Sequence, residues 1–369
     1  MENNRLLPVQ MLPIVSSTMM GVSILTFQRN LASIAKHDAW ISMFLGTIVG
    51  VISAVLLYNL IRLNPGLDFA EIVIAQAGNW VGRLLIIPIM AYILIDMGLS
   101  LRVFSFALKN FLLDRTPIFV ISLVLIIFLL AIVAKGIGAI AGVADILYPF
   151  FVISLILLIA LSSTEFRKFH IMPVLHNNML NTVKGSLPAF GAISGYSSFS
   201  YVMKYINEPK KAFKWFCAGF CISSILYIVL TLATVLSFVP ELIERISFPT
   251  LFLSKSIEVG GSFFERLEAF MVLIWVPAVF TSVGIYTFAS VRNFCVLFSI
   301  KPKHEKYVTY AHIPLLLAIT LYPKNQLQAT NLMDIFDTLA LIFSFGFVPL
   351  ILLLTLINKR RKAKNESKK

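Results

Sequence analysis

The chain has 369 residues, of which 58% are hydrophobic and only 13% are charged, and its mean hydropathy is +0.87. Because soluble domains carry about 25% charged residues, this composition excludes a soluble globular protein and indicates a polytopic membrane protein. Much of the net charge of +13 lies in the C-terminal tail and in short loops, which is typical of cytoplasmic loops. The expected partner of this surface is therefore the lipid bilayer and not a nucleic acid.

The hydropathy pattern predicts one transmembrane domain, residues 1–369, that ends in a basic tail at residues 358–369. An even number of spans places both termini on one side of the membrane. The Lys and Arg residues of the tail and of loops 204–214 and 292–306 favour the cytoplasmic side. The ten predicted spans lie at about residues 8–27, 39–62, 80–108, 117–134, 139–161, 187–206, 213–239, 266–298, 307–322 and 334–357.

The first and the sixth spans are interrupted by small and polar residues, at Ser16–Ser23 and Gly191–Ser198. Freed backbone groups at this depth are costly unless they face a cavity or a ligand. Tight helix packing explains one such patch, but two patches at matching positions indicate a transporter-type binding site. The sequence thus predicts an all-α protein of ten transmembrane helices in a five-plus-five inverted repeat with helices 1 and 6 broken. The residues expected in the unwound segments are Thr18, Ser23, Gly191 and Gly195, with Gly21 permitting unusual backbone angles.

Asp96 is the most informative ionisable residue, because it lies in the middle of the third span. A carboxylate at the bilayer centre is costly unless it is paired, protonated or hydrated. Tyr92 precedes it by four residues and shares its helical face. Asp96 is interpreted either as a contact for a cationic group of a ligand or a proton or cation site, or as a structural hydrogen-bond partner of the unwound backbone in the first or sixth span. Asp334 and Asp337 open the tenth span and are interpreted as structural, because carboxylates suit a helix N-terminus.

The eighth span carries Ser282 and Tyr286 on one helical face, after a proline, Pro277, that is expected to kink the helix. These hydroxyls face either a central cavity or a neighbouring helix. The preceding connection, residues 240–265, is divided by Pro249 into two amphipathic pieces, which form either a lid or an interfacial helix pair. No nucleotide-binding motif or nucleophile–histidine pair appears within the spans. An enzyme, a cofactor and a metal site are therefore not expected.

Four motifs, in order and spacing, resemble one known family: Ser17-Thr18-Met19-Met20-Gly21-Val22-Ser23-Ile24-Leu25-Thr26, Leu113-Asp114-Arg115-Thr116-Pro117, Phe248-Pro249-Thr250 and Glu265-Arg266-Leu267-Glu268-Ala269-Phe270. Over about residues 8–357 the chain is similar to the B subunits of bacterial spore germinant receptors. This family belongs to the amino acid–polyamine–organocation transporter superfamily. The resemblance implies a LeuT-like fold.

The resemblance also implies a function: sensing of a small germinant, such as an amino acid, a sugar or a nucleoside. It implies a location in the spore inner membrane with a larger membrane A subunit and a lipoprotein C subunit. An amino acid or cation permease of the same superfamily is the alternative function, and a scaffold with an inactive cavity is a third. The ligand-binding positions that it implies are Gly21, Tyr92, Ser198, Ser282 and Tyr286, with Asp96 one turn from Tyr92.

Two residues depart from the family pattern. Asp96 places an acid where apolar residues also occur, and Tyr201 stands where some relatives are expected to have an acid. The acid of the cavity is therefore expected to have moved from the sixth span to the third, so an L-alanine pocket is not assumed.

Overall fold

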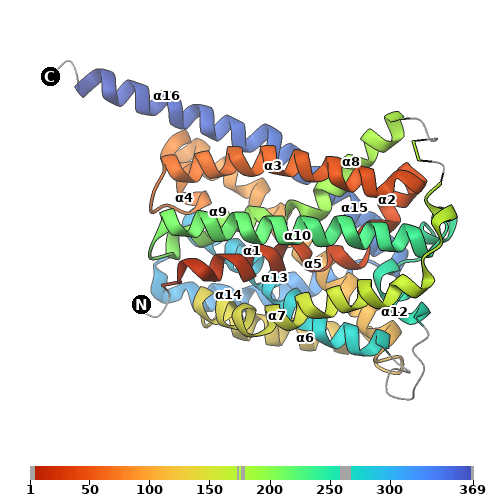
Figure 1. Ribbon diagram of the computed structural model, residues 1–369. Helices are drawn as coiled ribbons and strands as arrows, with labels where there is room; N and C mark the ends of the chain where they lie inside the picture. The colour runs from red at the N-terminus through yellow and green to blue at the C-terminus, as the bar shows by residue number, and fades with distance from the viewer. Residues whose placement is uncertain (1–4, 173, 176–178, 258–266, 367–369) are drawn as a thin grey trace.

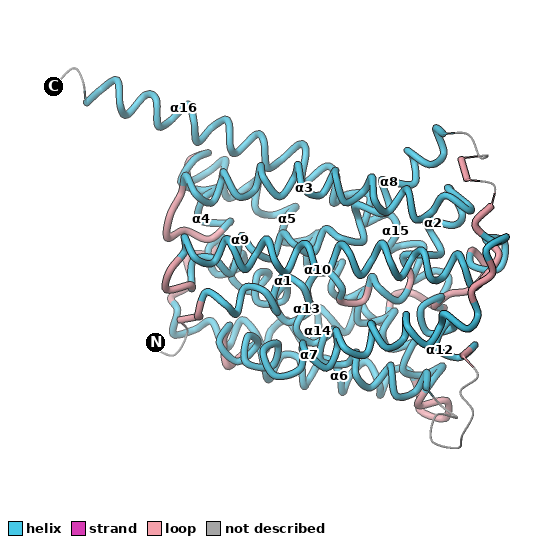
Figure 2. The backbone as a smooth tube through the Cα atoms, viewed as in Figure 1, coloured by secondary structure: helices cyan, strands magenta, loops and turns pink. Residues whose placement is uncertain are grey.

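The computed structural model describes residues 5–172, 174–175, 179–257 and 267–366 of the chain. Within these ranges, every regular element is helical, and the long helices run side by side with loops gathered at the two ends (Figures 1 and 2). The helices are α1 (Met11–Met20), α2 (Phe27–Ala35), α3 (Ala39–Leu63), α4 (Phe69–Ala77), α5 (Asn79–Phe111), α6 (Ile118–Val133), α7 (Ile137–Ser162), α8 (Met179–Ile193), α9 (Phe199–Val202), α10 (Pro209–Ser237), α11 (Pro240–Ile243), α12 (Pro249–Ser256), α13 (Leu267–Leu297), α14 (Glu305–Leu321), α15 (Gln326–Ile342) and α16 (Val348–Glu366).

Several helical runs have the length and composition needed to cross a bilayer. Large apolar side chains on the outside of the bundle, such as Phe128 and Ile153, are more than half exposed, which suits contact with lipid. The protein is therefore an integral membrane protein. Among the described residues, the six long apolar runs are Phe27–Leu63, Asn79–Phe111, Ile137–Glu165, Pro209–Ser237, Ala269–Leu297 and Gln326–Asn365, and Ile118–Val133 is a shorter one.

The number of spans stays a prediction, because residues 8–35 and 179–206 form pieces that are individually too short to cross a bilayer. α1 ends at Met20, since Gly21 adopts φ −9° and ψ −122° and leaves the helix. A single 3₁₀ turn, Ser23–Leu25, follows before α2 begins at Phe27. The helical structure continues to residue 35, beyond the predicted end of the first span at residue 27.

The second interruption follows α8, which begins at Met179, before the predicted start at residue 187. A 3₁₀ turn, Ser194–Ser198, separates α8 from the short α9. Two residues expected in unwound segments are helical: Thr18 lies in the last turns of α1 and Gly191 in the last turn of α8. The α-helical hydrogen bonds of α1 continue past Thr18, since Gly21 N–H donates to the Ser17 carbonyl oxygen at 2.9 Å. Regular α-helix therefore ends later than the sequence predicts.

In the C-terminal half, α13 is continuous through Pro277 and lies close to the bounds predicted for the eighth span. α15 and α16 join through a π-helical turn, Phe343–Phe347. α16 includes the first residues of the predicted basic tail and extends past the bundle (Figure 1). The connection after α10 forms α11 and α12 on either side of Phe248, as the position of Pro249 predicted. The remainder of that connection, residues 258–265, lies outside the described residues.

The first helix is the centre of the packing. α1 is buried along nearly its whole length and packs against α7, α10 and α13. Its end, at Met20, therefore lies among other helices, where unpaired backbone groups are shielded from lipid. This placement makes the interruption after α1 a part of the protein interior.

Candidate ligand-binding cavity

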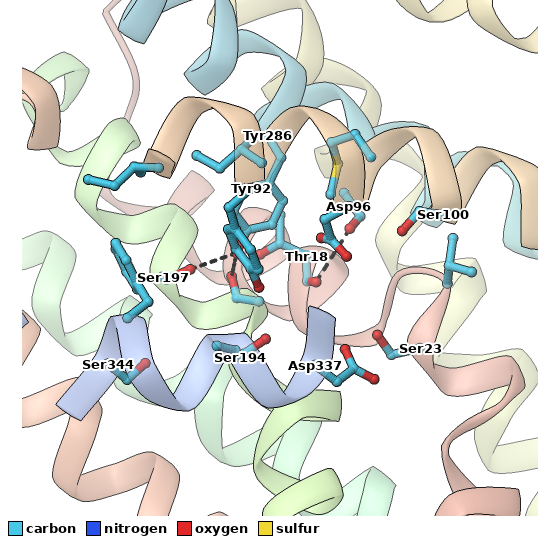
Figure 3. A pocket seen from close by; sticks show the side chains of 18 of the residues that line it. Thr18, Ser23, Tyr92, Asp96, Ser100, Ser194, Ser197, Tyr286, Asp337 and Ser344 are labelled. Carbon is cyan, nitrogen blue, oxygen red and sulfur yellow. Dashed lines mark hydrogen bonds between the residues drawn. The ribbon is translucent and has the colours of Figure 1, made fainter. Parts of the chain in front are cut away.

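A cavity of about 60 Å³ lies where the interruptions after α1 and α8 meet α5, α13 and α15 (Figure 3). Because about 10–15 Å³ of such space holds one water, the cavity has room for a few waters or one small solute. No lysine, arginine or histidine lines it within the described part of the chain. The polar residues of its wall are Thr18, Ser23, Tyr92, Asp96, Ser100, Ser194, Ser197, Ser200, Tyr201, Ser282, Tyr286, Asp337 and Ser344.

Tyr286 connects α13 to the second interruption. Its hydroxyl donates to the Gly195 carbonyl oxygen at 2.9 Å and lies 2.9 Å from the Ser197 hydroxyl. Since the phenol has one proton and that proton goes to the carbonyl, Ser197 is the donor in the second bond. One bond goes to the backbone and the other to a side chain of the same 3₁₀ turn, so together they orient the tyrosine ring along the cavity wall.

The two interruptions are joined directly by Thr18 and Ser198. The Thr18 hydroxyl lies 2.9 Å from the carbonyl oxygens of Ile14 and Val15 and also 2.9 Å from the Ser198 hydroxyl. Its proton is shared between the two carbonyls, so Ser198 donates to Thr18. Ser198 is fully buried. Its role in the structure is therefore to hold the interruptions together beside the cavity.

Two glycines allow the close approach of these segments. A Cβ atom on Gly195 would collide with the Thr18 carbonyl and lie 2.7 Å from Met19 Cα. A Cβ atom on Gly21 would collide with the Ser282 hydroxyl and lie 2.8 Å from Ser282 Cβ. Side-chain carbon at either position would push the first interruption away from the elements that complete the cavity.

The first interruption offers free backbone donors. Among the described residues, no hydrogen-bond acceptor contacts the N–H groups of Val22, Ser23 or Ile24. Val22 and Ser23 line the cavity. Consecutive free N–H groups at a helix start attract anionic and other acceptor groups, so this wall can receive a carboxylate or a hydroxyl oxygen of a solute.

Two carboxylates, Asp96 of α5 and Asp337 of α15, line the same cavity (Figure 3). In the part of the chain that the structure describes, neither carboxylate has a hydrogen bond or an ion pair, in contrast to Asp334, which accepts from Asn30 Nδ2 at 2.6 Å. Asp337 had been interpreted from the sequence as structural. It lines the cavity because Gly191 lacks a side chain, and a Cβ there would lie 2.7 Å from Asp337 Cβ.

One end of the bundle carries an ion-pair network. Asp68 caps α4: its Oδ1 accepts from Glu71 N at 3.1 Å, and Glu71 Oε2 accepts from Asp68 N at 3.0 Å. Arg292 Nη2 of α13 donates to Asp68 Oδ2 at 3.0 Å and to Glu71 Oε1 at 3.2 Å, while Lys204 also pairs with Glu71. Arg292 Nη1 also lies 3.8 Å from Glu305 Oε2. Burial raises the pKa of Glu305, which lies before the predicted ninth span, and Arg292 opposes that rise.

The other end is tied to the first interruption by α12. The Thr250 hydroxyl donates to the Ile24 carbonyl oxygen at 2.6 Å and accepts from Gln28 Nε2 at 2.6 Å. Lys36 pairs with Glu244 at 2.5 Å nearby. The helix α12 is thus bonded to the backbone beside the cavity.

Most of the residues chosen from the sequence meet in the cavity. Thr18, Ser23, Tyr92, Asp96, Gly195, Ser282 and Tyr286 line it, whereas Gly21, Gly191 and Ser198 stand behind its wall. The site residues chosen from the sequence do not include Asp337, which is interpreted there as structural, or the serines Ser100, Ser194, Ser197, Ser200 and Ser344. Asp337 could have been found from its place one helical turn after Asp334 in an apolar span, but Ser100 and Ser344 had no distinguishing sequence signal.

The comparisons with known proteins give the family and the fold. The family model described as "Spore germination protein" matches residues 5–329. Spore germination protein YndE of Bacillus subtilis (strain 168) is 25% identical, with 95% of each chain covered, and spore germination protein A2 of the same organism is 26% identical, also with 95% of each chain covered.

Among solved structures, Mhp1, a nucleobase-cation-symport-1 family transporter in a closed conformation with bromovinylhydantoin bound, has a TM-score of 0.71 at 14% identity. The comparison covers 95% of this chain and 78% of Mhp1. MhsT in complex with L-phenylalanine has a TM-score of 0.61 at 17% identity, covering 94% of this chain and 87% of MhsT. The chain shares the fold of these transporters. By the family match, which spans most of its length, the chain belongs to the spore germination protein family.

Proposed function

We propose that this chain is the B subunit of a nutrient germinant receptor, and that it binds a small germinant in the central cavity. The observation that carries the proposal is the cavity itself, whose lining includes both Asp96 and the residues Val22 and Ser23, which have free N–H groups. In a member of the spore germination protein family, such a polar, enclosed cavity suits recognition of a solute and not packing.

The proposed topology is ten transmembrane helices in a LeuT-like five-plus-five inverted repeat. In this arrangement α1 with α2, and α8 with α9, form the broken first and sixth helices. The interrupted helices carry the binding site, since unwound backbone is tolerated at membrane depth only where it lines a cavity. The basic C-terminal helix and the basic loops favour cytoplasmic termini.

The proposed binding mode uses both kinds of polar group in the wall. An acceptor group of the germinant, such as a carboxylate, lies against the N–H groups of Val22, Ser23 and Ile24. The ammonium group of the same germinant lies against Asp96. The hydroxyls of Ser282, Tyr286 and Ser197 surround the solute, and Tyr92 covers it. This arrangement involves no reaction, so the proposed protein is not an enzyme and needs no cofactor.

The signal is proposed to pass from the cavity through Thr250. This residue bonds the Ile24 carbonyl, next to a cavity residue, and fixes α12 at the end of the bundle. A germinant that binds one arrangement of the interruption more tightly than another shifts the population between them. The receptor A subunit, a membrane protein, and the lipoprotein C subunit are the proposed recipients of that shift in the spore inner membrane.

The test replaces Asp96 with asparagine in the full receptor in spores. Germination is measured against increasing concentrations of L-alanine, L-lysine and putrescine, which all carry a primary ammonium group, together with the amount of the protein in the spore membrane. We expect the half-maximal concentration of the effective germinant to rise at least about tenfold, since a hydrogen bond to a charged group contributes about 1.5–3 kcal/mol. Glu241→Gln, an equivalent change at an exposed position of α11, is the control. An unchanged dose response with the Asp96→Asn protein present would refute the proposal.

The alternative function is an amino acid or cation permease. It is favoured by the fold similarity to Mhp1 and MhsT, both transporters in structures that contain a bound solute or amino acid. Uptake of labelled L-alanine by purified protein in proteoliposomes distinguishes the two. Uptake that is abolished by Asp96→Asn supports the permease, whereas saturable binding without uptake supports the receptor subunit.

A further inference from the structure

The cavity contains two carboxylates, Asp96 and Asp337, and the second one affects which net charge a bound solute should carry. Asp96 projects from α5 and Asp337 from α15, and in Figure 3 the two lie on either side of Thr18. The helices that carry them are far apart in sequence, and α15 reaches the cavity only because Gly191 of α8 has no side chain. The two acids therefore meet through tertiary packing.

These two carboxylates lack the kind of partners that Asp68 and Asp334 have. Asp68 contacts Arg292 at 3.0 Å, and Asp334 contacts Asn30 at 2.6 Å. For Asp96 and Asp337 no ion pair or hydrogen bond exists within the described residues, and no basic side chain lines their cavity there. An ionised pair in this position is destabilised by desolvation and by mutual repulsion unless a positive charge enters.

A third polar group points to a ligand independently of the acids. Ser100 lies one helical turn after Asp96 on α5, is only 5% exposed, and lines the same cavity. Its hydroxyl has no hydrogen-bond partner among the described residues, although serine hydroxyls in helices commonly bond to the carbonyl four residues before. A buried hydroxyl group without a hydrogen-bond partner is costly. Because the Ser100 hydroxyl points toward the cavity, a solute bound there can be its partner.

We propose that the ligand of this cavity is a small organic cation with at least one primary ammonium group and a net positive charge. The ammonium lies between Asp96 and Asp337 and donates to both, and Ser100 accepts from it or donates to a neighbouring group. This inference rests on the proposed function, because it concerns the same cavity. A metal ion fits less well, since no group of three or more His, Cys, Asp or Glu residues with metal-binding geometry occurs in the described part of the chain.

The experiment measures the affinity of the purified full chain in lipid nanodiscs for three probes at neutral pH: putrescine, butylammonium and L-alanine. Putrescine and L-alanine have the same number of non-hydrogen atoms, so their comparison separates charge from size. We expect putrescine to bind most tightly and L-alanine most weakly. Asp337→Asn is expected to lower putrescine affinity about ten- to hundredfold, the range for loss of a charge-assisted hydrogen bond. Asp334→Asn, one turn earlier on α15 and outside the cavity wall, is the control and is expected to leave the affinity unchanged.

The results separate this inference from the proposed function. L-Alanine binding as tightly as putrescine, or putrescine affinity unaffected by Asp337→Asn, overturns the cation inference but leaves the germinant cavity in place. The rank order of the three probes is measured on the unmodified chain, so it decides the inference even if Asp337→Asn does not fold. The spore experiment with Asp96→Asn tests the germinant cavity itself, independently of the ligand's net charge.

Discussion

Replacing Gly195 with alanine tests the close contact on which the cavity depends. The new Cβ would lie 2.5 Å from the Thr18 carbonyl carbon and 2.7 Å from Met19 Cα. Ordinary contacts between carbon atoms are about 3.5–4.0 Å, so the two interruptions would have to separate by about 1 Å. The colliding atoms are backbone atoms of α1, and no change of rotamer relieves them.

The cost follows from the surrounding bonds. Tyr227 donates to the carbonyls of Met19 (2.9 Å) and Ala192 (3.2 Å) and so holds α1 to α8. Separation of the interruptions would stretch these bonds. Overpacking in a tight core costs about 1–3 kcal/mol, and we expect Gly195→Ala to lie at the upper end, about 3 kcal/mol. Gly195 does not have a positive φ, so this cost is steric.

The assay compares the unfolding of Gly195→Ala and Gly142→Ala in the same detergent. Gly142 lies in α7, where an added Cβ would meet nothing within 4 Å, and alanine is favoured over glycine in helices by about 1 kcal/mol. We expect the Gly195 variant to unfold at a lower temperature and lower denaturant concentration, and the Gly142 variant to be unchanged or more stable. Equal stability of the two variants would contradict the close contact.

Three further outcomes follow from the same structure. Gly21→Ala should destabilise the protein, and adding Ser282→Gly should restore stability because it removes the colliding atoms. Unfolding of the two single variants and the double variant checks this, and additive effects of the two changes on the free energy of unfolding would refute it. Arg292→Ala should cost about 3 kcal/mol, because it removes a partner of the buried Asp68, whereas a neutral effect would show that Lys204 suffices. Burial raises the pKa of Glu305 in the folded protein, so the folded state favours the protonated carboxyl group. The free energy of unfolding should therefore fall as the pH rises from the unfolded-state pKa of Glu305, about 4.3, through its higher folded-state pKa. Glu305→Gln should flatten this part of the stability–pH profile, and parallel profiles would refute the assignment.

The sequence was sufficient for the features that depend on local composition. The apolar runs identified a membrane protein and most of the helical segments, because hydropathy over about twenty residues is a local property. The glycine and serine runs near Gly21 and Gly195 marked the two regions where regular α-helix ends. Asp96 could be chosen because a carboxylate within an apolar span is costly wherever that span packs.

The boundaries were less accurate where helices leave the hydrocarbon core. α2 continues to Ala35 and α8 begins at Met179, since polar ends of a helix do not register as part of an apolar span. Thr18 and Gly191 were assigned to unwound backbone because small polar residues are poor helix formers. In the structure, packing against neighbouring helices keeps both helical.

The composition of the cavity wall was decided by tertiary structure. Which side chains face a common space depends on the rotation and approach of helices from distant parts of the chain, and a single sequence does not specify these angles. Ser198 therefore turned out to bond Thr18 behind the wall, while Asp337 and Ser100 came to line the cavity. The sequence by itself determined the membrane class and marked Asp96 as an acid within an apolar span, because both depend on local composition. The packing of α15 against α8 at Gly191 placed Asp337 in the same cavity, and no local pattern specifies that packing.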